Sequence, residues 1–143
     1  MIYIGSKEEN KEYEKRRAVF GIIYNDKNEI AIIDIDNFGF NLPGGKIEGN
    51  ENSEEALIRE VQEEIGYDIK NVKYLDTLGS YYLVNVRGKE IYCEAIADFY
   101  TAEISDKNNK KIEESHNLVW AVPNDIKDKL YFEYHRYVLE NKI

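Results

Sequence analysis

The sequence predicts a single α/β domain whose mixed β-sheet lies between helices. The chain has 143 residues, a common length for one domain, and 43% of them are hydrophobic, as in an ordinary globular protein. Apolar, β-branched segments alternate with polar turns along most of the chain. One helix is strongly marked in the middle, and a second is expected at the C-terminal end. This order indicates a sheet with helices on its faces, formed by residues 1–143 as one unit.

The predicted strands are apolar, rich in β-branched residues and bounded by turn residues. They are residues 18–24, 29–35, 38–42, 72–86, 90–105 and 118–122. The first two flank a polar turn at residues 25–28 and predict a hairpin, and the two longest flank a turn at 87–89. The third strand is followed by a turn at Gly44 and Gly45, and residues 106–111 are a polar loop.

The central helix is predicted over residues 53–65, beginning at Asn52 or Ser53. Ser53 can serve as the N-cap, and the two glutamates after it suit the positive end of the helix dipole. Apolar residues recur every four positions and make a packing stripe: Leu57, Val61 and Ile65. Gly66 supplies the C-terminal stop. The second helix is predicted over residues 131–140.

Charge and composition exclude several classes of protein. The formal net charge of −9 disfavours binding to a nucleic acid, whereas a small phosphorylated ligand carried with Mg²⁺ is compatible with it. Cys93 is the only cysteine, which excludes an intrachain disulfide and a thiolate metal site, and we expect it in the core. No apolar run approaches the ~18 residues of a membrane span, and the charged first fifteen residues are unlike a signal peptide. These features predict a cytoplasmic protein without a membrane segment.

Three glutamates of the central helix are its most informative feature. Glu60, Glu63 and Glu64 are spaced i, i+3 and i+4, which places all three on one face. Like charges at this spacing destabilise a helix, and a hard divalent cation such as Mg²⁺ would compensate because it prefers carboxylate oxygens. A solvated acidic face is the alternative. The metal site is favoured because the helix follows a Gly-Gly turn, whose open backbone groups can approach a phosphate closely.

Residues 45–67 (GKIEGNENSEEALIREVQEEIGY) resemble the Nudix box, G-x5-E-x7-R-E-U-x-E-E-x-G-U, in which U is apolar or aromatic. The chain fills every specified position: Gly45, Glu51, Arg59, Glu60, Val61, Glu63, Glu64, Gly66 and Tyr67. The preceding Leu42-Pro43-Gly44 also resembles the lead-in of this family. The resemblance implies the Nudix fold, an α/β/α sandwich.

The resemblance also implies roles for these residues. Glu60, Glu63 and Glu64 would hold Mg²⁺ or Mn²⁺, with the backbone carbonyl of Gly44 as a further ligand. Arg59 would pair with Glu51 and keep loop and helix in register. The general base is the least transferable part of the family pattern. Our candidate is Glu114, its neighbour Glu113 competes, and a glutamate of the box is a third option.

The activity implied is Mg²⁺-dependent cleavage of a diphosphate linkage in a nucleoside diphosphate derivative, such as a (d)NTP or a dinucleoside polyphosphate. In-line attack by a water that the metal activates would accomplish it. The alternative is a non-catalytic Nudix-fold sensor that only binds its nucleotide. The intact box favours catalysis, because sensors usually carry an eroded one.

Some residues stay outside this assignment. His116 and His135 are isolated and are interpreted as surface or packing residues rather than metal ligands. Among the twelve tyrosines, those on the long predicted strands are mainly packing residues, and one or two of them would stack on a base: Tyr81, Tyr82, Tyr92 and Tyr100. The sequence leaves a homodimer open, because no segment marks an interface.

Overall fold

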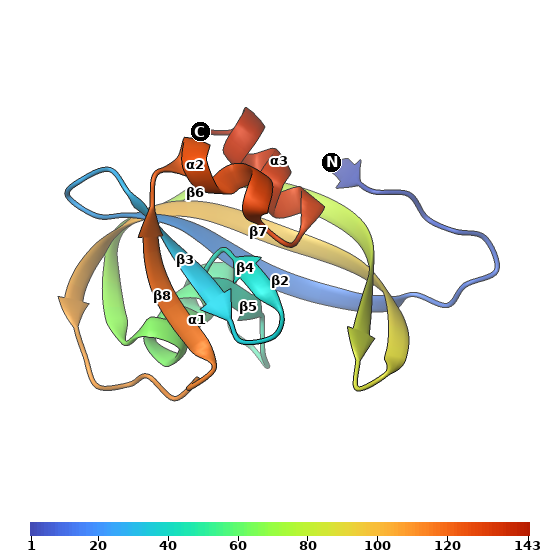
Figure 1. The fold of residues 1–143 in the computed structure, drawn as a ribbon, viewed down its shortest axis with the longest axis horizontal. Coiled ribbons are helices and arrows are strands. Elements are labelled where there is room, and N and C mark those ends of the chain that lie inside the picture. Colours follow the sequence, from blue (N-terminus) through green and yellow to red (C-terminus); the bar gives the residue numbers. More distant parts are fainter.

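A computed structural model describes residues 1–143 and confirms the mixed sheet between helices (Figure 1). The strands are β1 (Ile2–Ile4), β2 (Glu14–Tyr24), β3 (Ile30–Ile35), β4 (Gly39–Asn41), β5 (Gly44–Lys46), β6 (Tyr67–Val86), β7 (Lys89–Lys107) and β8 (His116–Ala121). The helices are α1 (Ser53–Ile65), α2 (Pro123–Ile126), a short 3₁₀ turn η1 (Lys127–Lys129) and α3 (Glu133–Asn141). None of the helices is long and apolar enough to cross a membrane.

Strand β2 is the centre of the sheet. It pairs in parallel with β7 over its whole length, from Glu14 opposite Cys93 to Tyr24 opposite Glu103. On its other side it meets β5 in antiparallel pairing, and it touches β3 only where Tyr24 faces Ile30. The predicted hairpin therefore opens directly after its turn. The order of the main path is β1-β6-β7-β2-β3-β4, with β8 beside β3.

The two faces of the sheet carry separate cores, because side chains alternate between the faces of a strand. Helix α1 covers one face, where it packs on alternate residues of β2 and β3 such as Val19 and Ala31. Helices α2 and α3 cover the other face, where they pack on Phe20 and Ile32. Figure 1 shows α1 below the sheet and the C-terminal helices above it.

Several elements differ from the prediction. β1 and α2 were not expected, and β2 begins at Glu14, four residues before its apolar part. The segment at Gly44 and Gly45 is strand β5 rather than an open turn, because Val19 and Phe20 of β2 pair with it. β6 starts at Tyr67, immediately after the helix, and bulges let it bend. Asn52, rather than Ser53, is the N-cap of α1.

His135 is a packing residue, as expected. Its ring is fully buried among aromatic side chains, and its Nδ1 accepts a hydrogen bond from the backbone N–H of Leu42 at 3.3 Å. Burial lowers the pKa of His135 to about 3. The folded chain therefore holds the ring of His135 in its neutral form. In the unfolded chain the same ring titrates near pH 6.5.

This shift predicts acid sensitivity. Below pH 6.5 the imidazole of His135 is protonated in the unfolded state but stays neutral in the folded state. His135 therefore lowers the free energy of unfolding progressively down to pH ~3. The loss approaches about 5 kcal/mol at the lower limit, at 1.36 kcal/mol per unit of pKa. Denaturant unfolding at several pH values measures it. The variant His135→Asn keeps an acceptor near Nδ1 and cannot titrate, so its profile should be flatter; equal profiles would contradict the prediction.

Candidate functional site

Helix α1 presents Glu60, Glu63 and Glu64 on the side that faces β5. The helix is closed at its start by a capping box, in which Asn52 and Glu55 bond each other's backbone N–H. It ends at Gly66 in the left-handed conformation. The two capped ends fix where the helix begins and ends. The apolar stripe of the helix packs in the core, on the side away from these glutamates. The side chains of the three glutamates are 16%, 29% and 5% exposed, in that order.

The two glycines of β5 bring the backbone against these carboxylates. The N–H of Gly44 donates to Oε1 of Glu64 at 2.8 Å. A Cβ at Gly44 would collide with the backbone carbonyl of Val19, and φ is +142° there. A Cβ at Gly45 would lie 2.9 Å from the carboxylate carbon of Glu60. At Gly44 only glycine allows this approach, whereas a side chain at Gly45 would displace the carboxylate of Glu60.

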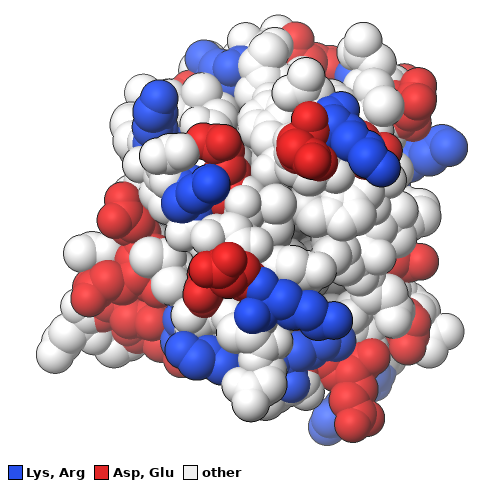
Figure 2. Space-filling view, turned by 90° about the vertical axis from the view of Figure 1, so that its left-hand side faces the viewer, with Lys and Arg blue, Asp and Glu red and all other residues white.

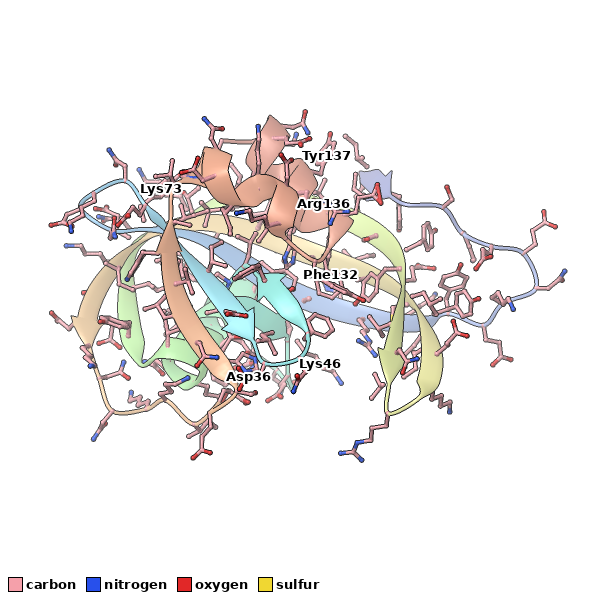
Figure 3. All side chains as sticks on the ribbon, in the orientation of Figure 1. Asp36, Lys46, Lys73, Phe132, Arg136 and Tyr137 are labelled. Atoms are coloured by element: carbon pink, nitrogen blue, oxygen red, sulfur yellow. The ribbon has the colours of Figure 1, made fainter.

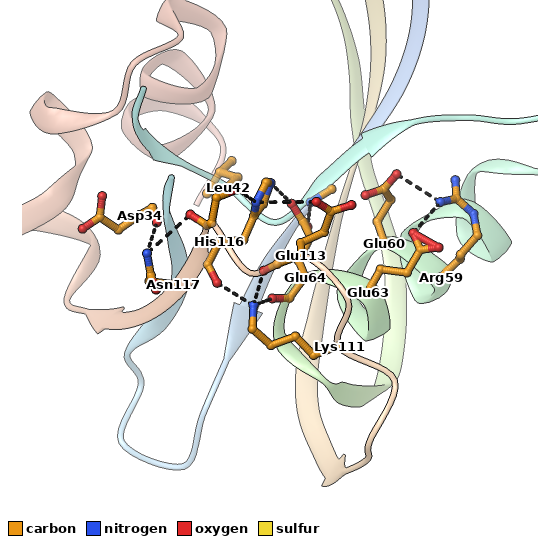
Figure 4. A network of polar contacts seen from close by, with 12 residues as sticks. Asp34, Leu42, Arg59, Glu60, Glu63, Glu64, Lys111, Glu113, His116 and Asn117 are labelled. Carbon is orange, nitrogen blue, oxygen red and sulfur yellow. Dashed lines mark hydrogen bonds and ion pairs between the residues drawn. The ribbon is translucent and has the colours of Figure 1, made fainter. Parts of the chain in front are cut away.

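Arg59 connects the carboxylates to the preceding loop, as expected from the motif. Its Nε and Nη2 bond both oxygens of Glu51, at 2.7 and 3.0 Å, and Nη2 also donates to the backbone carbonyl of Lys46. Its Nη1 lies 3.1 Å from Glu60 and 3.0 Å from Glu63, a contact that the sequence did not predict (Figure 4). The hydrogen bond with Arg59 lowers the pKa of Glu51.

The carboxylates lack sufficient positive charge around them. Burial raises the pKa of Glu60 to about 7, although Arg59 works in the other direction. Burial also raises the pKa of Glu64 well above its ordinary range, against the hydrogen bond from Gly44. Raised carboxyl pKa values mean that the charged forms are poorly stabilised by the protein alone.

The loop before β8 is bound to the C-terminal end of α1. The backbone N–H of Glu113 donates to the carbonyl of Glu63. Nζ of Lys111 donates to the carbonyls of Glu64, Glu113 and His116, each at 2.6 Å (Figure 4). An ammonium group satisfies helix carbonyls that have no partner in the helix. Lys111 therefore holds this loop beside the glutamates.

Replacing Lys111 by Met should release the loop. Three backbone carbonyls would lose a charged donor, and we expect the free energy of unfolding to fall by about 1–3 kcal/mol. Protection of the amides of residues 111–116 from hydrogen exchange should fall as well. Lys110→Met is the matched control, because its side chain makes none of these bonds, and it should leave both measurements unchanged. Equal exchange in the two variants would show that Lys111 does not anchor the loop.

The anchored loop places His116 and Glu113 near Glu64. Nε2 of His116 lies 3.5 Å from Oε2 of Glu64, and its Nδ1 lies 4.0 Å from Glu113. Burial lowers the pKa of His116, so the ring is neutral near pH 7. Sequence reasoning treated His116 as a surface or packing residue and did not predict its position beside Glu64. Glu114 is exposed, and no hydrogen bond or ion pair joins it to the glutamates.

A cavity of about 490 Å³ opens beside Gly44, Gly45 and Glu64. Aromatic side chains line part of it: Phe20, Phe38, Tyr82, Phe132 and Tyr134. Basic residues of β2 and β5 also line it: Lys15, Arg16, Arg17 and Lys46. Phe132 and Lys46 approach this region from opposite sides (Figure 3). Ring surface, cationic groups and the carboxylate helix thus border one space.

Elsewhere the surface carries mixed charge. Figure 2 shows basic side chains gathered below the centre of one face of the molecule, with acidic side chains to their left and right. The positive charge of the cavity is therefore local in a chain of net charge −9.

The donor chemistry of the three glutamates fits a hard divalent cation. Carboxylate oxygens are the ligands that Mg²⁺ and Mn²⁺ take, and the raised pKa values of Glu60 and Glu64 indicate a need for positive charge. In the structure no three His, Cys, Asp or Glu side chains converge to hold an ion. Arg59 and the N–H of Gly44 bond these oxygens instead. Arg59 takes one oxygen of each carboxylate, and the second oxygen of Glu60 and of Glu63 has no hydrogen-bond partner in the chain.

The tyrosines of the long strands, expected to be packing or base-stacking residues, lie in different surroundings. Tyr82 lines the cavity, as a base-stacking residue must. Tyr81 packs on Tyr3, and Tyr100 packs on Tyr74. Cys93 is buried, as expected. Sequence reasoning missed the contacts of Lys111 and His116, whose positions depend on pairing between distant segments.

The fold and the site define a class: an α/β/α domain in which a glycine pair faces three glutamates on the following helix. The NUDIX domain family profile matches residues 14–141, and the chain belongs to this family of hydrolases.

Comparisons with individual known proteins support the assignment to the NUDIX family. The chain is 57% identical over 37 residues to the 8-oxo-dGTP diphosphatase of Proteus vulgaris, covering 26% of this chain and 33% of that protein. It is 50% identical over 52 residues to the Bacillus subtilis (strain 168) protein named "Putative 8-oxo-dGTP diphosphatase YtkD", covering 36% of this chain and 29% of that protein. These matches span about a third of the relatives' length. The mutator MutT protein of Bacillus halodurans has a similar fold, with a TM-score of 0.69 and 20% identity over 88% of this chain and 80% of that one.

Proposed function

We propose that this chain is a pyrophosphohydrolase that cleaves the diphosphate linkage of a nucleoside triphosphate, with an oxidised purine deoxynucleotide as the first candidate. The observation that carries the proposal is the cavity, which joins aromatic and basic walls to Glu64 of α1 and to the glycine pair of β5. The description of the Proteus and Bacillus relatives supports the choice of nucleotide. A dinucleoside polyphosphate is the second substrate class that fits the same site.

In this proposal Glu60, Glu63, Glu64 and the carbonyl of Gly44 hold Mg²⁺ or Mn²⁺. Such an ion, when bound, neutralises phosphate oxygens and lowers the pKa of a bound water. Glu51 and Arg59 keep the loop and the helix in register through their bidentate pair. Lys15 and Lys46 border the cavity and would attract the phosphates.

The general base is proposed to be Glu113 rather than Glu114. Glu113 lies 4.0 Å from His116, and its charge acts on Glu64. Its side chain is 45% exposed, so it can accept a proton from an attacking water and release it to solvent. We expect Glu113→Gln to lower kcat by roughly 10²-fold or more with little change in KM. Glu114→Gln is the matched control, and a larger loss of kcat in that variant would return the role to Glu114.

The test of the function is hydrolysis of a substrate panel with Mg²⁺ or Mn²⁺. The panel contains dNTPs and 8-oxo-dGTP, ADP-ribose, NDP-sugars, diadenosine polyphosphates, NADH and coenzyme A, with release of phosphate and pyrophosphate followed. Metal-dependent turnover of a triphosphate with release of pyrophosphate would support the proposal. Tight nucleotide binding without turnover would replace it by the sensor function.

A further inference from the structure

One carboxylate outside the cavity connects four elements of the fold. Asp98 of β7 stands opposite Val19 of β2, so its side chain lies on the face of the sheet that α1 covers. This side chain is only 14% exposed. It accepts hydrogen bonds from Ser53 at the start of α1, from Arg17 of β2 at 3.2 Å and from Thr77 of β6 at 2.7 Å. The proposed hydrolysis gives this carboxylate no role.

Asp98 is bonded to both ends of the loop of residues 47–52, which joins β5 to α1. At the start of the loop the N–H of Ile47 donates to the backbone carbonyl of Arg17. The guanidinium of Arg17 in turn donates to Oδ2 of Asp98. Just after the loop, the hydroxyl of Ser53 donates to the same oxygen. The loop is therefore closed on one carboxylate of the sheet.

The two ends of α1 are held by different contacts. The C-terminal end is bonded to the loop before β8 through Lys111. At the N-terminal end, the bond from Ser53 to Asp98 joins the helix to the sheet. Ala56 and Leu57 add apolar contacts there. Apolar contacts are not directional, whereas a hydrogen bond requires a narrow range of distance and angle, so Asp98 fixes where the helix starts.

The position of this end bears on the glutamates that face β5. Glu60, Glu63 and Glu64 lie about two to three turns beyond Ser53 on the same helix. A displacement of the start of α1 would move these carboxylates relative to the glycine pair. Mg²⁺ demands near-ideal octahedral geometry, so a site for it tolerates such a displacement poorly.

We propose that Asp98 is a positioning residue for the metal site. Through Ser53 it fixes the start of α1, and thereby the distance of the three glutamates from β5. The inference rests on the proposed function, because it takes these glutamates as metal ligands. It gives Asp98 no contact with substrate or ion. The bond from Ser53 should therefore matter for metal affinity, whereas the bond from Thr77, which joins only β6 and β7, should not.

The experiment compares the loss of two different donors to the same carboxylate. Ser53→Ala removes the donor on α1, and Thr77→Val is the matched control that removes the donor on β6. In the control Oδ1 of Asp98 keeps no donor, whereas in Ser53→Ala its Oδ2 keeps Arg17. The control should therefore lose at least as much stability, which thermal unfolding checks. Ser53→Thr keeps the hydroxyl and is the rescue variant.

Mn²⁺ alone is the probe, and electron paramagnetic resonance of the free ion gives its Kd without nucleotide or turnover. We expect Ser53→Ala to raise this Kd roughly 10-fold, and Thr77→Val and Ser53→Thr to leave it unchanged. Hydrogen exchange of the amides of residues 47–56 should become faster in Ser53→Ala alone. Asp98→Leu removes the acceptor, so combining it with Ser53→Ala should raise Kd no further than Asp98→Leu does.

The outcomes separate the inference from the proposed function. Unchanged Mn²⁺ affinity in Ser53→Ala would overturn the inference, even if its amides exchange faster. An equal loss of affinity in Thr77→Val would overturn it as well, because the effect would then follow general stability. A chain that binds no Mn²⁺ before any substitution would contradict the proposed function, and the inference would fall with it.

Discussion

Replacing Glu63 and Glu64 together by Gln is expected to lower kcat of the metal-dependent hydrolysis by about 10³-fold or more. A bound divalent ion supplies several kcal/mol of charge stabilisation in such reactions, and each 1.36 kcal/mol is a tenfold change in rate. The two carboxylates are adjacent in the sequence on the side of α1 that faces β5, and amide oxygens hold Mg²⁺ far less strongly. Steady-state kinetics with the substrate found in the panel, over a Mg²⁺ titration, measure the loss.

The same variant should not unfold the protein. Glu64 is buried and its pKa is raised, so its charged form costs stability near pH 7 and a neutral Gln removes that cost. The Tm is therefore expected to stay equal or rise. Glu54→Gln is the control on the first turn of the helix, where the side chain is exposed, and it should retain full activity. Full activity in the double variant would exclude these glutamates as metal ligands.

Gly44→Ala is expected to cost roughly 3–5 kcal/mol of the free energy of unfolding. The conformation at φ +142° is strained for any residue with a Cβ, which costs about 1–3 kcal/mol. The added methyl group also meets the backbone of Val19 and Phe20, which are paired strand residues and cannot move aside. Denaturant unfolding at neutral pH measures the loss, and activity should disappear with it because the Gly44 N–H bonds Glu64.

Gly49→Ala separates the two causes. Gly49 also has a positive φ, of 52°, but nothing lies within 4 Å of the added Cβ. Its substitution should therefore cost only about 1 kcal/mol, the strain of the left-handed region. A similar loss for both variants would mean that the close approach of β5 to β2 does not contribute.

The helix and its glutamates could be predicted because their signals are local. The spacing of Glu60, Glu63 and Glu64 defines a helix face whatever surrounds it. The motif predicted the pairing of Arg59 with Glu51. The recurrence of apolar residues at every fourth position predicted the packing stripe of α1. The structure confirms the helix over the predicted residues.

The remaining features depend on contacts between distant segments. Gly44 and Gly45 have the composition of a turn, and only the approach of β2 makes them a strand. His116 resembles an isolated surface histidine until β8 pairs with β3 and brings it beside Glu64. The partner of Lys111 is the end of a helix more than forty residues earlier. No periodic pattern in the sequence indicates which distant residues come into contact.

The parallel pairing of β2 with β7 also bears on how the chain folds. Residues 14–24 emerge early in synthesis, yet their long partner, residues 93–103, comes near the end. The hairpin of β6 and β7 is local and can form by itself, after which β2 must close a large loop to reach it. Until then the apolar C-terminal part of β2 has one unpaired edge. We therefore expect slow refolding on the scale of small domains, with the hairpin protected before the sheet is complete.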